Sequence, residues 1–141
     1  MDKSILIGLI GMLLSACATA QQSETEAIKA TIKNFSNAGD FNDAKTLDKY
    51  LDENYRVVMN QLFGSTEVVI MPRSVYLEKI ASKEFGGDSR DITIEKVLVN
   101  GNTASAKVTF KGTKMTFVSI VTLVKHQNGE WKMLSDVPVV I

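Results

Sequence analysis

The sequence predicts an α+β fold, in which three amphipathic helices cover one face of a strongly bent, mainly antiparallel sheet. Two observations carry this prediction. Apolar residues recur at helical spacing in three segments before residue 88, whereas strand-type alternation separated by turn residues fills the rest. The resulting order is helix, helix, strand, strand, helix and then four strands, which is typical of helices segregated to one side of an antiparallel sheet. The 141-residue chain has the length of one domain.

The N-terminal segment resembles the signal peptide of a bacterial lipoprotein. Lys3 precedes an apolar run from Ile5 to Leu14, and small residues lead to Cys17, the only cysteine. The run is too short to span a bilayer, which takes about 20 residues. We expect residues 1–16 to be removed, Cys17 to be acylated, residues 17–23 to form a lipidated tether and residues 24–141 to form the folded domain.

This resemblance implies export to the bacterial cell envelope, as a lipoprotein of the outer membrane that faces the periplasm. Ala18, which follows the cysteine where Asp would favour retention, is typical of that destination. An ordinary secretory cleavage site, Ala18-Thr19-Ala20 before Gln21, is the alternative, and it predicts a soluble periplasmic or secreted protein.

Two helices open the domain. The segment Ser23-Glu24-Thr25-Glu26 has the form of a capping box, so the first helix is expected at Glu24–Asn37, with Gly39 as its stop. Asp40 and Asn42 can cap a second helix. Its expected apolar positions are Ala44, Leu47, Tyr50 and Leu51.

Strands and a third helix follow. Alternation predicts a strand at Tyr55–Asn60, and Gly64-Ser65 turns the chain into a second strand at Glu67–Met71. The third helix starts after Pro72 and ends at Phe85-Gly86-Gly87. The last four strands are expected around Ile92 and Ile94, at 104–110, at 114–126 and at 131–140, with hairpins at Asn100-Gly101 and Asn128-Gly129.

The strand at 114–126 is apolar on both faces. Phe117, Val121 and Leu123 point one way, while Ile120 and Val124 point the other. Three helices can cover only one face, so we expect a homodimer through the outer sheet face. The alternative is a sheet that curls enough to bury part of its own back.

Three motifs carry a family resemblance. They are Asn54-Tyr55-Arg56-Val57-Val58-Met59, Val75-Tyr76-Leu77-Glu78-Lys79-Ile80 and Asn128-Gly129-Glu130-Trp131-Lys132-Met133. With the order of elements, they make residues 24–140 resemble the nuclear transport factor 2-like superfamily, and most closely its putative lumazine-binding family. The resemblance implies a cone with an apolar cavity, often dimeric. These are packing and turn motifs, which concern fold more than chemistry.

Enzymes of this superfamily, such as ketosteroid isomerases and small polyketide cyclases, place a carboxylate and a Tyr or His donor inside the cone. A carboxylate between apolar walls gains a raised pKa, which suits proton transfer. Here the first helix has Phe35 and no Tyr, and Asp52 and Glu53 stand beside Tyr55 in a polar turn. The resemblance therefore does not extend to that catalytic pattern.

Three residues are weak functional candidates. Asp136 interrupts the apolar last strand and is either a functional group with a perturbed pKa or an edge residue, and Pro138 nearby favours the edge. His126, the only histidine, is expected at an exposed strand end. Trp131 shares a face with Met133 and is either a core residue, which we favour, or a ligand-stacking residue.

Composition removes several classes of partner. Lys plus Arg and Asp plus Glu number 16 each, which argues against nucleic acid as a partner. One histidine excludes a multi-histidine metal site, and no cofactor is indicated. The favoured function is non-catalytic, lipid-anchored binding of a small apolar or aromatic molecule. The expected pocket residues are Tyr55, Met59, Phe117 and Trp131. The alternatives are a lyase or isomerase that uses Asp136 as base, and an envelope interaction protein with a solid core and no ligand.

Overall fold

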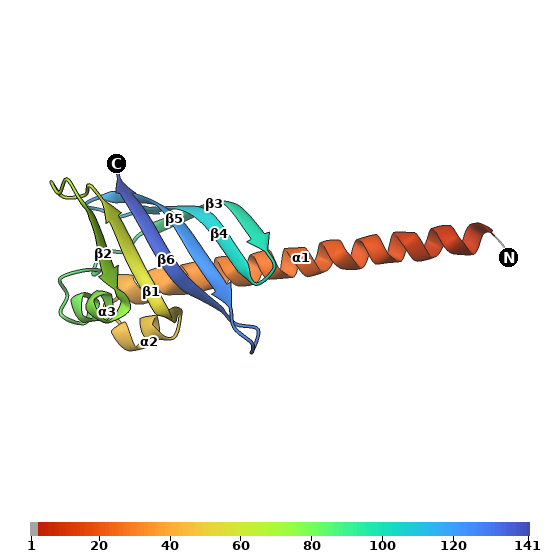
Figure 1. Ribbon diagram of the computed structural model, residues 1–141, viewed down its shortest axis with the longest axis horizontal. Helices are drawn as coiled ribbons and strands as arrows, with labels where there is room; N and C mark the ends of the chain where they lie inside the picture. The colour runs from red at the N-terminus through yellow and green to blue at the C-terminus, as the bar shows by residue number, and fades with distance from the viewer. Residues whose placement is uncertain (1–2) are drawn as a thin grey trace.

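The computed structural model describes residues 3–141, with side chains from Ala16 onward, and it confirms the expected fold class (Figure 1). Three helices accompany one six-stranded sheet of order β2-β1-β6-β5-β4-β3. The helices are α1 (Lys3–Asp40), α2 (Ala44–Asp48) and α3 (Arg73–Ala81). The strands are β1 (Leu51–Asn60), β2 (Val68–Pro72), β3 (Asp91–Asn100), β4 (Thr103–Lys111), β5 (Thr116–Lys125) and β6 (Trp131–Val140). All neighbouring strands are antiparallel except β1 and β6, which are parallel.

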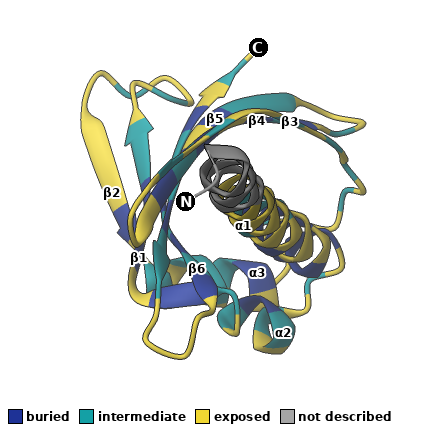
Figure 2. Cartoon of the chain, turned by 90° about the vertical axis from the view of Figure 1, so that its right-hand side faces the viewer, coloured by how far each residue is buried: buried dark blue, intermediate teal, exposed yellow. Residues whose placement is uncertain are grey.

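The sheet curls around the C-terminal half of α1 (Figure 2). One stripe of this helix, Ile28, Ile32 and Phe35, is almost fully buried against the concave face. From the sheet, the alternating residues Val108 and Val121 meet it with no exposed surface. Helical spacing on α1 and period-two alternation on the strands thus supply the two sides of one apolar core.

The first helix begins far earlier than expected. The structure shows α1 as one continuous helix from Lys3, so the helix start predicted at Glu24 is wrong. The Thr25 hydroxyl donates to the Gln21 carbonyl, one helical turn back, instead of marking a helix start. Residues 16–22, directly before Ser23, contain three Ala and two Gln and no Gly or Pro, so helix propagation overrides the local capping signal.

The second helix is shorter than expected. It ends at Asp48, and Leu51 begins β1 instead of closing the helix. Asp43 is its N-cap residue and accepts a hydrogen bond from the Thr46 amide. None of the helices in the described residues is both long and apolar enough to cross a membrane.

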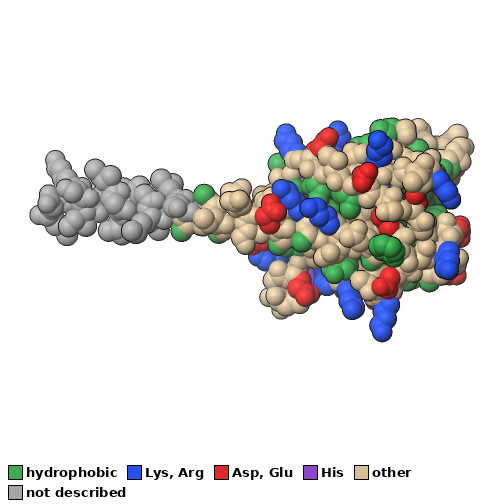
Figure 3. All heavy atoms as spheres, turned by 180° about the vertical axis from the view of Figure 1, so that it is seen from behind, with side chains coloured by type: hydrophobic (Ala, Val, Ile, Leu, Met, Phe, Trp, Pro, Cys, Tyr) green, Lys and Arg blue, Asp and Glu red, His purple; other side chains and the backbone are tan. Residues whose placement is uncertain are grey.

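The outer face of the sheet keeps large apolar side chains in solvent. Ile120 is 49% exposed, and Leu98 and Val139 are also exposed. The curl of the sheet therefore leaves these residues uncovered within one chain, and the homodimer stays a prediction. Charged side chains of both signs are interspersed over the face seen in Figure 3.

Candidate functional site

A cavity of about 540 Å³ lies between α3, the C-terminal end of α1 and the concave face of the sheet. This volume falls in the usual range for small-molecule sites, roughly 300–1,000 Å³. Its walls are mainly apolar and aromatic: Val57, Met59, Tyr76, Phe85, Phe110 and Phe117. Leu62, Phe63, Lys114 and Met115, from the segment after β1 and the turn before β5, also line it.

Asp136 supplies a carboxyl group to this apolar cavity. It lies on β6, paired with Val57 of β1 on one side and with Val121 of β5 on the other. Its Oδ1 atom is buried and has no hydrogen-bond partner among the described residues. Burial raises the pKa of Asp136 to about 6. The nearby Ser119 hydroxyl opposes this rise without completing a hydrogen bond, and Arg90 opposes it more weakly.

The expectation that Asp136 is an edge residue is wrong. Strand β6 is central, because it has a neighbour on each side. It forms an antiparallel hairpin with β5 and a parallel pair with β1. Pro138 lies beyond the last pair of β1 and β6, Val57 with Asp136, so its missing N–H interrupts no pairing with β1. Asp136 therefore lies on a central strand and borders the cavity, so it is not an edge residue.

Two tyrosines accompany the carboxyl. Their rings are in contact, with the centroids of Tyr55 and Tyr76 5.4 Å apart. Burial, followed by the negative charge of Asp136, raises the pKa of Tyr76 well above its usual range. Burial and the neighbouring Tyr76 do the same to the pKa of Tyr55. Both side chains therefore remain neutral hydroxyls beside Asp136 at physiological pH.

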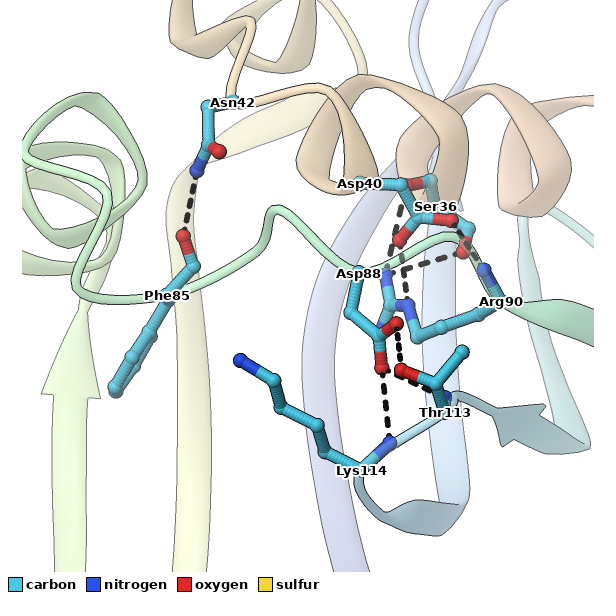
Figure 4. A network of polar contacts seen from close by, with 8 residues as sticks. All are labelled: Ser36, Asp40, Asn42, Phe85, Asp88, Arg90, Thr113 and Lys114. Carbon is cyan, nitrogen blue, oxygen red and sulfur yellow. Dashed lines mark hydrogen bonds and ion pairs between the residues drawn. The ribbon is translucent and has the colours of Figure 1, made fainter.

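Arg90 is a cation of the cavity wall, and its charge is already matched by Asp40 (Figure 4). Its Nε donates to Asp40 Oδ1 over 2.6 Å, and its Nη2 donates to Ser36 Oγ over 3.1 Å. Its guanidinium also lies over the Phe110 ring, 4.9 Å from the centroid. Asp40 is the last residue of α1 and Arg90 directly precedes β3, so this ion pair connects the two elements. The Asp40 side chain is only 4% exposed, so removing its partner would leave a buried charge.

The loop from α3 to β3 is held to α1 by close contacts. Asn42 donates from Nδ2 to the carbonyl oxygens of Ile80 and Phe85, over 3.0 and 2.6 Å (Figure 4 shows the second bond). Gly86 has a φ of +77°, and a Cβ there would lie 2.1 Å from the carbonyl oxygen of Gly39. Only glycine fits this close approach.

Asp88 holds the turn between β4 and β5 on the same side. Its carboxylate accepts hydrogen bonds from the amide and hydroxyl of Thr113, over 2.8 and 2.7 Å, and from the amide of Lys114 (Figure 4). These bonds, those from Thr113 first, lower the pKa of Asp88. Asp88 and Lys114 line the cavity, so this turn shapes part of its wall.

The four expected pocket residues lie in different places. Met59 and Phe117 line the cavity. Tyr55 is buried behind Tyr76 and does not itself line it. Trp131 lies away from the cavity beside the middle of α1, where its Nε1 donates to Glu24 over 2.7 Å. It is buried, in agreement with the core interpretation.

His126 is an exposed residue at the end of β5, as expected, but it has a partner that the sequence did not suggest. Its Nε2 lies 2.8 Å from Asp52 Oδ2. Although burial opposes the change, the Asn54 amide and then His126 hold the pKa of Asp52 below its usual range. This pair is not part of the cavity lining.

Sequence reasoning missed Tyr76, Arg90 and Ser119 as cavity residues. Ser119 interrupts the inward-facing positions of an apolar strand, which is the same signal that singled out Asp136. Tyr76 reads as an ordinary helix core residue, and nothing local distinguishes Arg90. In the part of the chain that the structure describes, no three His, Cys, Asp or Glu residues come together as a metal site.

Comparisons with known proteins agree with this architecture. Residues 18–137 match the family model described as putative lumazine-binding. No curated protein sequence matches the chain. Among solved structures, an NTF-2 like protein of unknown function from Silicibacter pomeroyi is 19% identical with a TM-score of 0.74, covering 86% of this chain and 98% of its own.

Two further solved structures are similar. An NTF2-like protein of unknown function from Shewanella baltica is 16% identical with a TM-score of 0.72, covering 84% of this chain and 94% of its own. A ketosteroid isomerase-like protein from Erwinia carotovora atroseptica is 13% identical with a TM-score of 0.64, covering 82% and 95%. Identities this low show a shared fold alone.

Proposed function

Since this chain belongs to the putative lumazine-binding family, within the nuclear transport factor 2-like superfamily, we propose that it binds a small, largely apolar or aromatic molecule in the cone cavity. The observation that carries this proposal is a pair of polar groups at one apolar wall. Asp136 Oδ1 and Ser119 Oγ are both buried, and both lack a hydrogen-bond partner among the described residues. Leaving a buried polar group unpaired costs about 1–3 kcal/mol, so a bound molecule that pairs with them would recover that cost.

The proposal includes a location. We propose that Cys17 carries a lipid that holds the protein in the cell envelope, most simply at the outer membrane facing the periplasm. More than one acyl chain at this cysteine would give stable attachment. We also propose a homodimer through the outer sheet face, where Ile120, Leu98 and Val139 are exposed.

Native mass spectrometry of the Cys17→Ser chain, from residue 17 and purified gently from a bacterial host, tests the binding proposal. We expect a stoichiometric small-molecule adduct, on a dimer if the outer face pairs. The variant Val57→Phe places a larger side chain in the cavity and should remove the adduct. The same exchange at exposed Val69 of β2 is the matched control and should keep it. An adduct-free wild-type chain, or an adduct that survives in Val57→Phe, would contradict binding in this cavity.

A proton-transfer enzyme, a lyase or isomerase with Asp136 as base, is the second candidate. One observation favours it: a pKa of about 6 suits a general base near neutral pH, and the neutral Tyr76 hydroxyl stands nearby as a donor. The test is deuterium incorporation into the captured molecule during incubation with protein in D₂O. Carbon-bound deuterium that depends on Asp136 would make the protein an enzyme, and its absence would leave it a binding protein.

The interaction protein without a ligand has less support. That hypothesis needs a core packed solid by Phe35, Phe63, Phe117 and Trp131. Phe63 is instead 69% exposed, and Phe63 and Phe117 border the open cavity.

A further inference from the structure

We propose that the molecule bound in the cavity carries a protonated nitrogen at the end that reaches Asp136, so that the ligand class is a small aromatic or alkyl amine. This inference rests on the proposed binding function and adds the charge of the ligand. It follows from the charges, the ring faces and the unpaired oxygen atoms of the cavity.

The balance of charges leaves one carboxylate without a partner. Arg90 is the positive group whose charge acts on Asp136, but Asp40 and Ser36 already hold its guanidinium. The other charged residues of the lining are Glu84, Asp88 and Lys114, and Asp88 is bonded to the β4–β5 turn. Lys79 pairs with Glu84, the charge of Lys114 acts on Asp88, and Arg90 pairs with Asp40. An ionised Asp136 therefore leaves one negative charge in the lining, which a bound cation would neutralise.

The aromatic walls suit a cation. Tyr76, Phe85, Phe110 and Phe117 all line the cavity, and the face of such a ring attracts positive charge. Two of these rings already hold protein cations. Arg90 lies over Phe110, and the ammonium of Lys79 lies 5.3 Å from the Phe85 centroid.

The available oxygen atoms match an ammonium group. An ammonium has up to three N–H donors, and the cavity wall offers Asp136 Oδ1 and Ser119 Oγ without partners, together with the neutral hydroxyl of Tyr76. A charged donor to a carboxylate forms a stronger hydrogen bond than a neutral donor does. A neutral ligand would leave the buried charge of Asp136 unmatched, and an anionic one would oppose it.

Three probes of one shape test this inference. We would titrate the Cys17→Ser chain with 2-(aminomethyl)naphthalene, 2-naphthalenemethanol and 2-naphthoic acid at pH 7.5, using isothermal calorimetry. We expect the amine to bind at least about tenfold more tightly than the alcohol, the size of one charge-assisted bond, and the acid to bind most weakly. Asp136→Asn should remove the preference for the amine while the alcohol keeps its affinity. The control Asp91→Asn, at an exposed carboxylate, should keep the preference.

The pH dependence of the wild-type chain gives a second test that needs no variant. Asp136 ionises with a pKa of about 6, so the affinity for the amine should rise about tenfold from pH 5 to pH 7, while that for the alcohol stays level or falls. The groups that face Asp136 are Tyr55 from β1, Tyr76 from α3 and Arg90, which is paired with Asp40. Burial raises both tyrosine pKa values, away from this pH range.

The outcomes separate the two proposals. If the alcohol binds as tightly as the amine at pH 7.5, or if the affinity for the amine is level between pH 5 and pH 7, the amine class is wrong and the binding function stands. If none of the three probes binds, both proposals fail. A preference for the amine that rises with pH and disappears in Asp136→Asn supports both.

Discussion

Replacing Asp136 by Asn should stabilise the protein at neutral pH. Burial raises the pKa of this carboxyl from 3.8 to about 6 in the folded chain. The folded state therefore binds the proton more tightly than the unfolded state does. This contribution to stability is complete below pH 3.8 and is lost as the pH rises through about 6. At 1.36 kcal/mol for each unit of pKa, the ionised carboxylate costs about 3 kcal/mol above pH 7.

Asparagine has nearly the same shape and no charge, so it avoids this cost. We expect the free energy of unfolding of Asp136→Asn to exceed that of the wild type by up to about 3 kcal/mol at pH 7.5. The advantage should shrink below about 1 kcal/mol at pH 4, where the wild-type carboxyl is protonated. Urea unfolding followed by circular dichroism at both pH values measures it. The exposed Asp91→Asn is the control and should change little. An advantage that is absent at pH 7.5, or equal at both pH values, would refute the assignment of Asp136 as a buried, unpaired acid.

Three further predictions address other parts of the molecule. Arg90→Met should destabilise the fold by about 3–5 kcal/mol in urea unfolding, because it leaves the buried Asp40 carboxylate without the guanidinium that neutralises it. Adding Asp40→Asn should restore much of that loss, and an additive second loss would contradict the pairing. Gly86→Ala should cost at least about 2 kcal/mol, because its Cβ would meet the Gly39 carbonyl in a left-handed backbone, and an unchanged thermal midpoint would contradict this contact. Cys17→Ser should release the folded protein from the membrane fraction, and a variant that stays in the membrane pellet would disprove the lipid anchor.

Most of the sheet could be predicted from the sequence, because its signals are local. Alternation along 104–110 and 131–140 and the turns at Asn100-Gly101 and Asn128-Gly129 correspond to β4, β6 and their hairpins. Pro72 likewise precedes α3 directly. These features depend on residues close together in the chain, so one sequence suffices to recognise them.

The site could be predicted only in part, because it depends on contacts between distant residues. The central position of β6 follows from its parallel pairing with β1, which is far from it in the sequence and leaves no local signal. Local signals alone therefore place Asp136 at an edge, and Pro138 favours the same wrong position. For Trp131, alternation along β6 predicts which face of the sheet the side chain lies on, but not whether it lies near the cavity or near the opposite end of the domain. Arg90 became visible only through its contacts with Asp40 and Ser36.

The continuity of α1 determines how far the domain would stand from a membrane. Cys17 and Ile28, the first buried residue after Cys17, are joined by helix alone. At 1.5 Å per residue, this segment spans roughly 16 Å. It leaves the domain at the end opposite α3 and the turn between β1 and β2 (Figure 1). A lipid on Cys17 would thus hold the protein on a stiff spacer, with the cavity directed toward the aqueous compartment, so that its ligand would arrive from solution and not from the bilayer that carries the anchor.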